Sequence, residues 1–456
     1  MNALVITAVS GVVMMFSGFL LKRSSGVHYL AVLLMLLVIV ANILEMNGIV
    51  FVNVNLDGMM FFDRFALLFT TVAYSATLLF FLLSGKDMEK VGVHYSDYFA
   101  LIFFILAGIA LSASFNSLLI LFLGIEIISI PLYVLAGADK RNLKSNEASL
   151  KYFLMGSFST GLMLMGIALI YGAKGTFSTE AAIASDKIPV LLVVGMMLLL
   201  FAMSFKVSAA PFHFWTPDVY DGSPTVFTSF MATVVKAATF IAFMRLFSDA
   251  FGGIRSEWKL LVSIIVALTL FIGNIIAVFQ QSVKRMLAYS SIAQAGFMML
   301  AVYSLNAEAR EGLILYAAAY SLATIGIFAV LLKMNDYTFD GFNGFAKQQP
   351  LLAATLVVFL LSLAGIPLTA GFLSKFYMLK ATLNGGSVWL ALFAVLMAAV
   401  SVYYYFRLVQ AMYFKEGNAT IAFEITPVFK ATLVALAVLT IVLGLFPNLL
   451  TNWLYF

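Results

Sequence analysis

The sequence has no cysteine, three histidines and few charged residues: Asp, Glu, Lys and Arg together make up 10% of 456 residues. Without a thiol the chain forms no disulfide, performs no thiolate catalysis and ligates no iron-sulfur cluster through cysteine. No two histidines have the spacing of metal ligands on one helix face, so we predict no metal site. The formal charge of +5 and the pI near 9.1 do not indicate nucleic-acid binding, because the basic residues are scattered and form no single patch.

Long hydrophobic runs fill most of the chain instead. Hydrophobic residues make up 63% of it and the mean hydropathy is +1.06, far outside the range of soluble globular proteins. A membrane-spanning helix needs about 20 mostly apolar residues, and the sequence offers fourteen such segments. They lie near residues 2–21, 28–45, 65–84, 98–115, 117–136, 148–172, 188–210, 223–247, 259–280, 285–304, 312–334, 350–383, 387–414 and 428–450. We therefore predict an all-α polytopic membrane protein.

The charges around these segments predict their orientation. Lys22 and Arg23 follow the first apolar run and do not precede it, so this run is expected to be a retained span and not a cleaved signal peptide. An even number of spans leaves both ends of the chain on one side of the membrane. The odd-numbered loops carry about 13 Lys and Arg residues and the even-numbered loops about 7, and cytoplasmic loops carry the excess. Both termini are therefore expected on the outer side.

Two of the fourteen segments are interrupted. The seventh runs into AAPFH at 209–213, and the twelfth carries GIPLTAG at 365–371. Proline removes a backbone hydrogen bond from each helix. Irregular backbone at membrane depth persists only where it is buried in protein or lines a wet cavity. The breaks therefore indicate an internal pathway, although either one alone could be an ordinary proline kink.

The two breaks occupy matching places in a repeat. Each is the fourth segment of a block of five, at residues 98–247 and 259–414. Because five is an odd number, the second block is expected to be inverted relative to the first, and inverted repeats with broken helices are typical of transporters. Residues 1–97 would then add three N-terminal helices, and residues 415–456 one C-terminal helix.

Four ionisable residues lie where the membrane disfavours them. Glu126 is the only carboxylate near the middle of a predicted span. Lys206 precedes the first break, Lys236 lies halfway along the eighth span, and Lys375 follows the second break. A charged side chain at the bilayer centre costs several kcal/mol, so such residues mark functional sites by default. For the three lysines the alternative stays open that each only neutralises a partner.

Two further residues are candidates with weaker support. Lys151 follows Glu147 by one helical turn, a spacing that is equally common in structural ion pairs. His213 lies in the first break, and histidine takes up and releases a proton near neutral pH. A hydrogen-bonded structural role is equally consistent with a single histidine.

These placements suggest a way to move protons. Burial disfavours the charged form of an ionisable group, whereas an opposite charge nearby favours it. If Glu126 pairs with Lys206, a charge moved next to either residue changes the proton affinity of Lys236 and then of Lys375. Such a chain would translocate protons without a covalent intermediate.

One stretch of sequence is long enough to indicate a family. Residues 205–225, FKVSAAPFHFWTPDVYDGSPT, resemble the antiporter-like subunits of respiratory complex I. The form WTPDVYDG is similar to that of the subunit N family and differs from that of subunits L and M. Three further segments agree: EIISIPLYVLAG at 126–137, EASLKYFLMGS at 147–157 and KRMLAYSSIAQAG at 284–296. Together they cover most of residues 98–380.

The resemblance implies a membrane-arm subunit of proton-translocating NADH-quinone oxidoreductase in a bacterial inner membrane, with periplasmic termini. It implies that this chain holds no cofactor and carries protons only, while partner subunits bind NADH, flavin (FMN), iron-sulfur clusters and quinone. The implied partners are the neighbouring antiporter-like subunit M, the small subunits K, A and J, and membrane lipids. The proton relay implied by similarity comprises Glu126, Lys206, Lys236, Lys375, His213 and Lys151.

Other functions share some of these features. A cation/proton antiporter subunit of the Mrp type or a membrane hydrogenase subunit resembles the same scaffold. Only the amino-acid sequence of residues 215–224 and 289–296 distinguishes the subunit N family from these two. A purely structural scaffold would gain nothing from burying four titratable residues. A solute transporter also has inverted repeats and midplane charges, but the sequence shows no polar cluster beside the breaks large enough for a solute.

Overall fold

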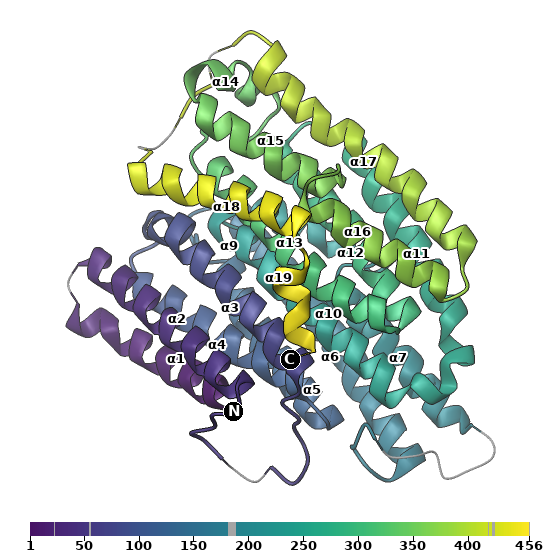
Figure 1. Cartoon of the computed structure of the whole chain (residues 1–456). Coiled ribbons are helices and arrows are strands. Elements are labelled where there is room, and N and C mark those ends of the chain that lie inside the picture. The colour runs from purple at the N-terminus through teal and green to yellow at the C-terminus, as the bar shows by residue number, and fades with distance from the viewer. Residues whose placement is uncertain (22, 54–55, 181–187, 418, 422–424, 456) are drawn as a thin grey trace.

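The computed structural model describes residues 1–21, 23–53, 56–180, 188–417, 419–421 and 425–455. Within these ranges the chain is helical, and β-structure is limited to isolated bridges. The long helices run side by side across the molecule, with α1 (Asn2–Leu20) and α2 (Ser24–Met46) at one flank (Figure 1). At the opposite flank lie α11 (Arg255–Val278) and α17 (Val388–Phe414). The predicted all-α polytopic fold is confirmed.

The first half of the chain continues with α3 (Arg64–Ser84), η1 (Gly85–Lys90), α4 (Tyr95–Ser114), α5 (Leu118–Ala136), α6 (Leu143–Lys174), α7 (Val190–Lys206), α8 (Trp215–Gly222), α9 (Thr225–Phe230), the π-helical turn η2 (Met231–Val235), α10 (Lys236–Arg245) and a second π-helical turn η3 (Leu246–Ala250). The second half contains α12 (Val283–Ser304), α13 (Ala307–Leu331), α14 (Phe345–Gln348), α15 (Pro350–Ala364), α16 (Ala370–Asn384), α18 (Pro427–Leu445) and α19 (Asn448–Thr451).

Twelve helical segments of the described residues are long and apolar enough to cross a membrane, or thirteen if α15 is joined to residues 340–348, from which it is bent by 120°. The two remaining predicted spans are the interrupted ones. Helix α7 has 17 residues, while α15 and α16 have 15 each. The predicted breaks are confirmed at 207–214 and 365–369. The count of fourteen spans and the inversion of the two blocks stay predictions.

Polar side chains begin several of these helices. Asp63 accepts a hydrogen bond from the Ala66 N–H (2.8 Å) at the start of α3, and Asn306 accepts one from the Ala309 N–H (2.9 Å) at the start of α13. Such caps satisfy backbone donors that have no partner within the helix. Helix α6 ends at Gly175, whose positive φ of 71° suits glycine. Local sequence thus sets these helix ends independently of packing.

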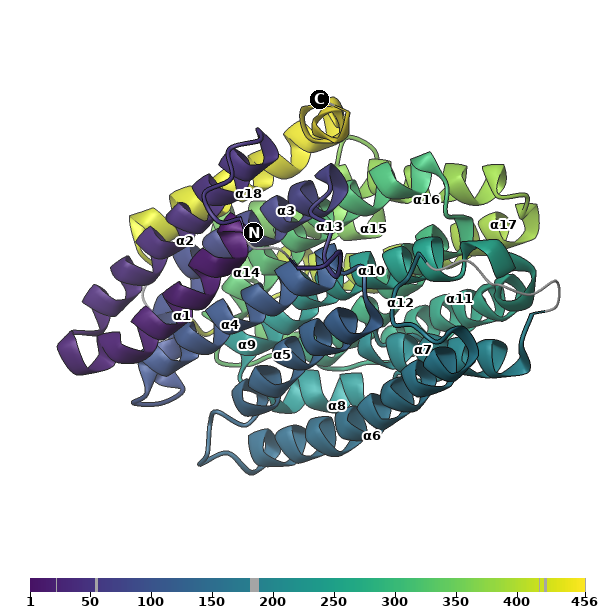
Figure 2. The same ribbon diagram turned by 90° about the horizontal axis from the view of Figure 1, so that it is seen from below.

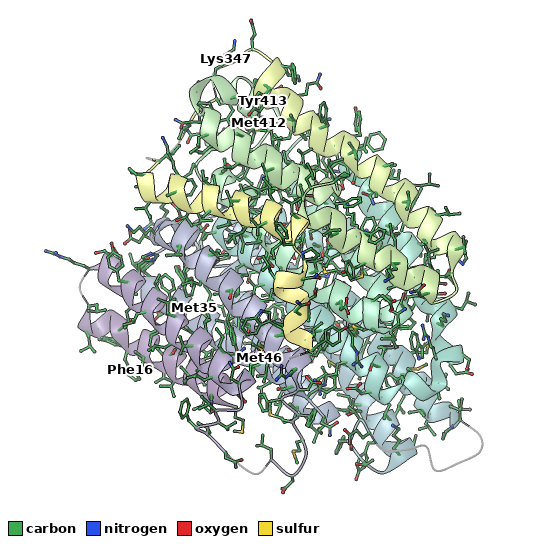
Figure 3. All side chains as sticks on the ribbon, viewed as in Figure 1. Phe16, Met35, Met46, Lys347, Met412 and Tyr413 are labelled. Carbon is green, nitrogen blue, oxygen red and sulfur yellow. The ribbon has the colours of Figure 1, made fainter. Side chains whose placement is uncertain are left out.

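The centre of the bundle is built from helices that are buried on every side. Every residue of 225–247, 290–304 and 312–331 is buried, including polar residues such as Lys236 and Gln294. The outer helices differ. On α1 the side chain of Phe16 is 54% exposed, whereas Met35 on α2 is fully buried (Figure 3). The outer apolar faces are where lipid or partner subunits can contact this chain.

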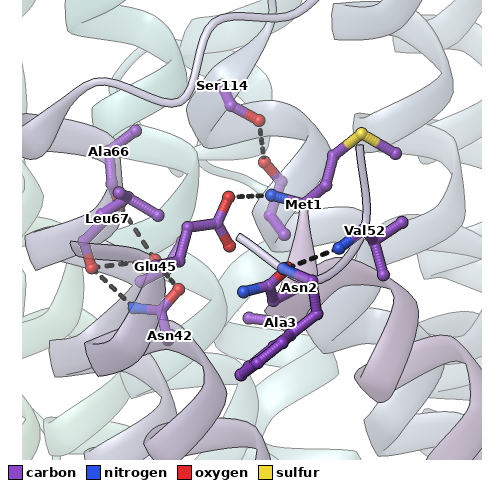
Figure 4. A network of polar contacts seen from close by, with 12 residues as sticks. Met1, Asn2, Ala3, Asn42, Glu45, Val52, Ala66, Leu67 and Ser114 are labelled. Atoms are coloured by element: carbon purple, nitrogen blue, oxygen red, sulfur yellow. Dashed lines mark hydrogen bonds and ion pairs between the residues drawn. The ribbon is translucent and has the colours of Figure 1, made fainter. Parts of the chain in front are cut away.

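Polar contacts tie the three N-terminal helices together. Asn42 of α2 donates hydrogen bonds to the Leu67 carbonyl (2.8 Å) and to the Thr71 hydroxyl (2.7 Å) of α3. The amino group of Met1 pairs with Glu45, so the start of α1 meets the end of α2 (Figure 4). These contacts are valuable in an apolar surrounding, where an unpaired polar group is disfavoured.

Candidate functional site

Two helices bring Glu126 and Lys206 together. Glu126 projects from α5 and Lys206 is the last residue of α7, and Lys206 Nζ lies 3.5 Å from Glu126 Oε1. Their side chains are only 17% and 8% exposed. Close packing of α5 against α4 supports this position, because a Cβ on Gly124 would lie 2.8 Å from the Ser112 nitrogen. The pairing that the sequence suggested is therefore present.

Each member of this pair also has a neutral hydrogen-bond partner. Lys206 Nζ donates to the Ser129 hydroxyl (2.9 Å), and Thr160 of α6 donates to Glu126 Oε1 (2.7 Å). Sequence reasoning missed both hydroxyls. Ser129 follows Glu126 by three residues and so shares its helix face, a periodicity that could have indicated it. Thr160 comes from a separate helix, and no local pattern points to it.

The first break is fixed by contacts to its surroundings. The Ala210 N–H donates to the Thr269 hydroxyl of α11 (2.8 Å), and Trp215 Nε1 donates to the Phe205 carbonyl across the break (3.1 Å). Ser208 adopts a positive φ of 65°, which is uncommon for a residue with a side chain. The break is thus a defined structure at the end of the helix that carries Lys206.

His213 lies in this break among buried polar atoms without partners. Its side chain stacks on Phe214 with ring centroids 4.6 Å apart, and its Nδ1 has no hydrogen-bond partner among the described residues. The hydroxyls of Ser204, Ser208 and Thr216 are in the same state. Buried polar groups are normally paired with protein or ordered water. Four such atoms around one break agree with the expectation that it lines a wet region.

Lys236 lies at the centre of the bundle. It begins α10 directly after the π-helical turn η2, and such turns often occur at functional sites. Its Nζ donates to the carbonyl (3.0 Å) and the hydroxyl (2.6 Å) of Ser291 on α12, and it lies 5.6 Å from the centre of the Tyr220 ring. Within the described ranges no carboxylate forms an ion pair with it. Lys236 is held by neutral groups only.

Lys375 lies against the second break. Its Nζ donates to the carbonyls of Leu363 (2.7 Å) and Ala364 (3.0 Å), which end α15, and lies 4.7 Å from the Phe297 ring centre. These carbonyls lack helical partners because the helix stops there. Gly365 has a positive φ of 84°, and a Cβ there would lie 2.8 Å from Lys375 Cδ. Glycine therefore makes room for the lysine.

Two polar residues one turn apart on α12, Ser291 and Gln294, lie next to Lys236 and Lys375, and we refer to them as the polar route. Gln294 follows Ser291 by one turn of α12 and donates to the Leu363 carbonyl (3.0 Å), which also accepts from Lys375. A cavity of about 10 Å³, enough for one water molecule, borders Gln294 and Lys375. Sequence reasoning did not select Ser291 or Gln294 as site residues. Neutral polar residues are common in buried helices, so no signal in one sequence distinguishes these two.

Lys151 does not join the buried residues. Its side chain is 41% exposed and its Nζ pairs with Glu147 (2.7 Å) and with Asp218 (2.9 Å). The pair with Glu147 is the one that the spacing predicted. The structure thus places Glu126 with Lys206 and sets polar residues of α12 beside Lys236 and Lys375. It places His213 in the first break and Lys151 in a half-exposed ion network.

Sequence reasoning also missed a buried ion pair. Lys333, two residues after α13, donates to both carboxylate oxygens of Asp87 in η1 (2.7 and 3.0 Å). The two residues are 246 positions apart, and Lys333 at the end of a predicted span resembles an ordinary interfacial lysine. In the part of the chain that the structure describes, no group of three or more His, Cys, Asp or Glu side chains could hold a metal ion.

Known proteins are similar to this chain in sequence and in fold. The family model for the transmembrane part of NADH:quinone oxidoreductase and Mrp antiporters matches residues 115–401. The chain is similar to NADH-quinone oxidoreductase subunit N of Cytophaga hutchinsonii, with 40% identity over 99% of this chain and 98% of that protein. It is also similar to a chain of respiratory complex I from Thermus thermophilus with bound aureothin, with a TM-score of 0.84, 34% identity and 99% and 98% of the two chains covered.

A third similarity concerns the fold alone. A chain of the Mrp complex from Dietzia sp. DQ12-45-1b superposes with a TM-score of 0.85, covering 100% of this chain and 96% of that chain, at 19% identity. The three-dimensional arrangement of helices is therefore common to the wider group of membrane proteins, whereas the high sequence identity is to subunit N.

Proposed function

The chain belongs to the family of NADH-quinone oxidoreductase subunit N, and on that premise we propose that it translocates protons through its own buried side chains. Electron transfer from NADH to quinone in partner subunits would drive this movement. The observation that carries the proposal is the Glu126–Lys206 contact of 3.5 Å together with the polar route from Lys236 to Lys375.

The proposed mechanism is electrostatic. A proton on Glu126 removes the charge that favours the ammonium form of Lys206, and Ser129 and Thr160 keep the two side chains in place in either state. The release of a proton from Lys206 changes the field at the deeper lysines, Lys236 and then Lys375. His213 and the unpaired hydroxyls of the first break lie at the end of α7, where ordered water would bridge the gap.

The proposal assigns all redox chemistry to other subunits. This chain has no cysteine, and we propose that NADH, FMN, the iron-sulfur clusters and quinone are held by partners. The partners in the membrane arm are proposed to be the antiporter-like subunit M and the small subunits K, A and J. Membrane lipids would cover the remaining exposed apolar faces, such as those of α1 and α18.

The proposed organisation follows the two breaks. Residues 98–247 and 259–414 would form two inverted repeats, with residues 1–97 and 415–456 added before and after them. Each block contains one interrupted helix with a buried lysine beside it, Lys206 in the first and Lys375 in the second. In a bacterial inner membrane, the excess of basic residues in the odd-numbered loops would place both termini in the periplasm.

An Mrp-type cation/proton antiporter is the alternative function on this scaffold. The membrane hydrogenase subunits are a related possibility. The identity to the Mrp chain is 19%, which is lower than the 40% identity to subunit N.

Replacing Lys206 by alanine in the native membrane tests the proposal. We expect NADH-driven proton uptake and quinone reduction both to be lost while the amount of assembled complex stays unchanged. Lys140→Ala, the same change at an exposed loop position, should retain both activities. If Lys206→Ala also retains both, Lys206 is a structural counter-charge and a scaffold role would replace the proposed one.

A further inference from the structure

An open cavity lies at the end of the bundle that carries the odd-numbered loops. It has a volume of about 250 Å³ and is lined by the charged side chains of Lys144, Glu147, Lys151, Asp218, Asp221 and Arg285. Ion pairs join them, among them Arg285 to Asp218 (3.2 Å) and Lys151 to Asp218 (2.9 Å). The paired side chains are about one third to two thirds exposed, so water reaches the cavity.

Lys284 lies directly behind this cavity and is buried, with 4% exposure. Its Nζ donates to the carbonyl of Asp221 (2.9 Å), a residue of the cavity wall, and to the carbonyl of Ser223 (2.7 Å). No ion pair to Lys284 occurs among the described residues. The function proposed above does not use this lysine, although burying it is expensive for the protein.

Helix α12 connects Lys284 to the central lysine. Ser291, which accepts two hydrogen bonds from Lys236, lies seven residues after Lys284, and this spacing puts both on one helix face. The distance along the axis is about 10.5 Å. Ala288 lies between them on this face and is buried.

Buried hydroxyls that have no hydrogen-bond partner among the described residues lie on α8, directly after it and on α9. The side chains of Thr216, Ser223 and Ser229 are buried and lack hydrogen-bond partners within the described ranges. Thr216 and Ser223 belong to α8 and its end, and α8 contacts both α6 and α12. Figure 2 shows α8 between the long α6 and the core helices. Such hydroxyls are the partners that ordered waters need.

We propose that this cavity is the inlet through which protons reach Lys236, and that Lys284 is the first buried group to take them up. The inference rests on the proposed proton-translocating function. The Lys284 ammonium releases one proton inward, toward the hydroxyls and Lys236. The resulting amine takes one proton from cavity water, so Lys284 is regenerated and one proton has moved inward.

A structural role for Lys284 makes a different prediction. Its two carbonyl acceptors lie at the end of α8, where a cation stabilises the helix terminus whether or not it exchanges protons. Arginine keeps that cation and its hydrogen-bond donors but does not release a proton at physiological pH. The variant Lys284→Arg therefore separates proton transfer from helix capping.

The experiment compares Lys284→Arg, Lys333→Arg and Lys206→Ala in native membranes at equal amounts of assembled complex. We expect Lys284→Arg to lower NADH-driven proton uptake about 100-fold or more, the typical contribution of a proton-transfer group. Lys333→Arg makes the same change at a buried lysine away from the cavity, and its pairing with Asp87 suits arginine. It should keep proton uptake near the wild-type rate.

The three variants distinguish two failures. If Lys284→Arg takes up protons at the wild-type rate and Lys206→Ala loses proton uptake, the inlet proposal is wrong and the proposed function still stands. Wild-type uptake in both variants overturns the proposed function itself.

A second measurement tests the proposal if the complex with Lys284→Arg does not assemble. The chain has no cysteine, so Lys144→Cys places a single thiol in this chain, on the cavity wall. A bulky charged thiol reagent should slow proton uptake in this variant several-fold more than in Arg141→Cys, three residues earlier and outside the cavity lining. Complete modification of both variants with equal rates would contradict the inlet.

Discussion

At the scale of single residues, Glu126 and Lys206 are close but form no direct hydrogen bond. Their separation of 3.5 Å exceeds the usual length of a direct hydrogen bond, and each group has a hydroxyl partner of its own, Thr160 or Ser129. When one charge is neutralised, the other side chain therefore keeps a hydrogen bond and its position. This arrangement suits a pair whose protonation changes during turnover, because the geometry does not depend on both charges being present.

Replacing Glu126 by glutamine tests the role of its charge. Glutamine keeps the side-chain volume and can still accept the Thr160 hydrogen bond, but it cannot take up a proton. We expect the initial rate of NADH-driven proton uptake, followed with a pH-sensitive dye, to fall about 100-fold or more. Thr160→Val should lower it only about fivefold, because a net hydrogen bond contributes about 1 kcal/mol. Equal rates in Glu126→Gln and the wild type would show that this charge is dispensable.

At the scale of helices, the two breaks present their lysines differently. In the first, Lys206 ends α7 and points to a carboxylate on α5. In the second, Lys375 follows the break and covers the free carbonyls of Leu363 and Ala364. The first lysine is therefore tuned by a charge and the second by main-chain dipoles, which no protonation event can remove.

The second break depends on glycine at position 365. Alanine there would adopt an unfavourable positive φ, at about 1–2 kcal/mol, and its Cβ would lie 2.8 Å from Lys375 Cδ. We expect Gly365→Ala to displace Lys375, lowering both proton uptake and the melting temperature of the purified complex. Gly172→Ala in α6, where the nearest side-chain atom is 4.0 Å away, should change neither. A fully active, equally stable Gly365→Ala complex would mean that Lys375 tolerates displacement.

The positions of the breaks and of the four central charges could be predicted from the sequence, because each violates a strong rule of the membrane. Pro211 and Pro367 lack the backbone N–H that a helix interior requires. A charge on Glu126 within the membrane costs several kcal/mol. The neutral members of the route could not be predicted. Gln294 of α12 reaches the end of α15 through one hydrogen bond to the Leu363 carbonyl, and this contact between distant segments leaves no pattern in one sequence. Lys151 fits its local pair with Glu147 but lies outside the buried route.

At the scale of the whole molecule, one buried ion pair joins distant parts of the chain. Lys333 after α13 meets Asp87, which follows α3 and also pairs with Lys90. The Lys333 ammonium lies 5.0 Å from the Phe429 ring centre on α18. N-terminal, central and C-terminal helices are thus held at one point.

Removing one member of this pair should destabilise the complex. Asp87→Asn leaves Lys333 buried without a counter-charge, which costs about 3–5 kcal/mol. We expect less assembled complex and a lower melting temperature. The double variant Asp87→Asn with Lys333→Met should recover much of the loss, since no buried charge remains unpaired. Lys347→Met at an exposed position (Figure 3) controls for the loss of a lysine. An unaltered melting temperature in Asp87→Asn would contradict a stabilising role of this ion pair.

The orientation of the whole molecule decides which side of the membrane the inlet cavity faces. Lys144 on the cavity wall belongs to the same loop region as Lys140 and Arg141, and the odd-numbered loops carry about 13 basic residues against about 7, which predicts a cytoplasmic position. A membrane-impermeant maleimide should therefore label Arg141→Cys in inverted vesicles only and Glu257→Cys in intact spheroplasts only. The reverse pattern would place the cavity on the periplasmic side, where it would serve as an outlet, and the order of proton transfer from Lys284 to Lys236 would have to be reversed.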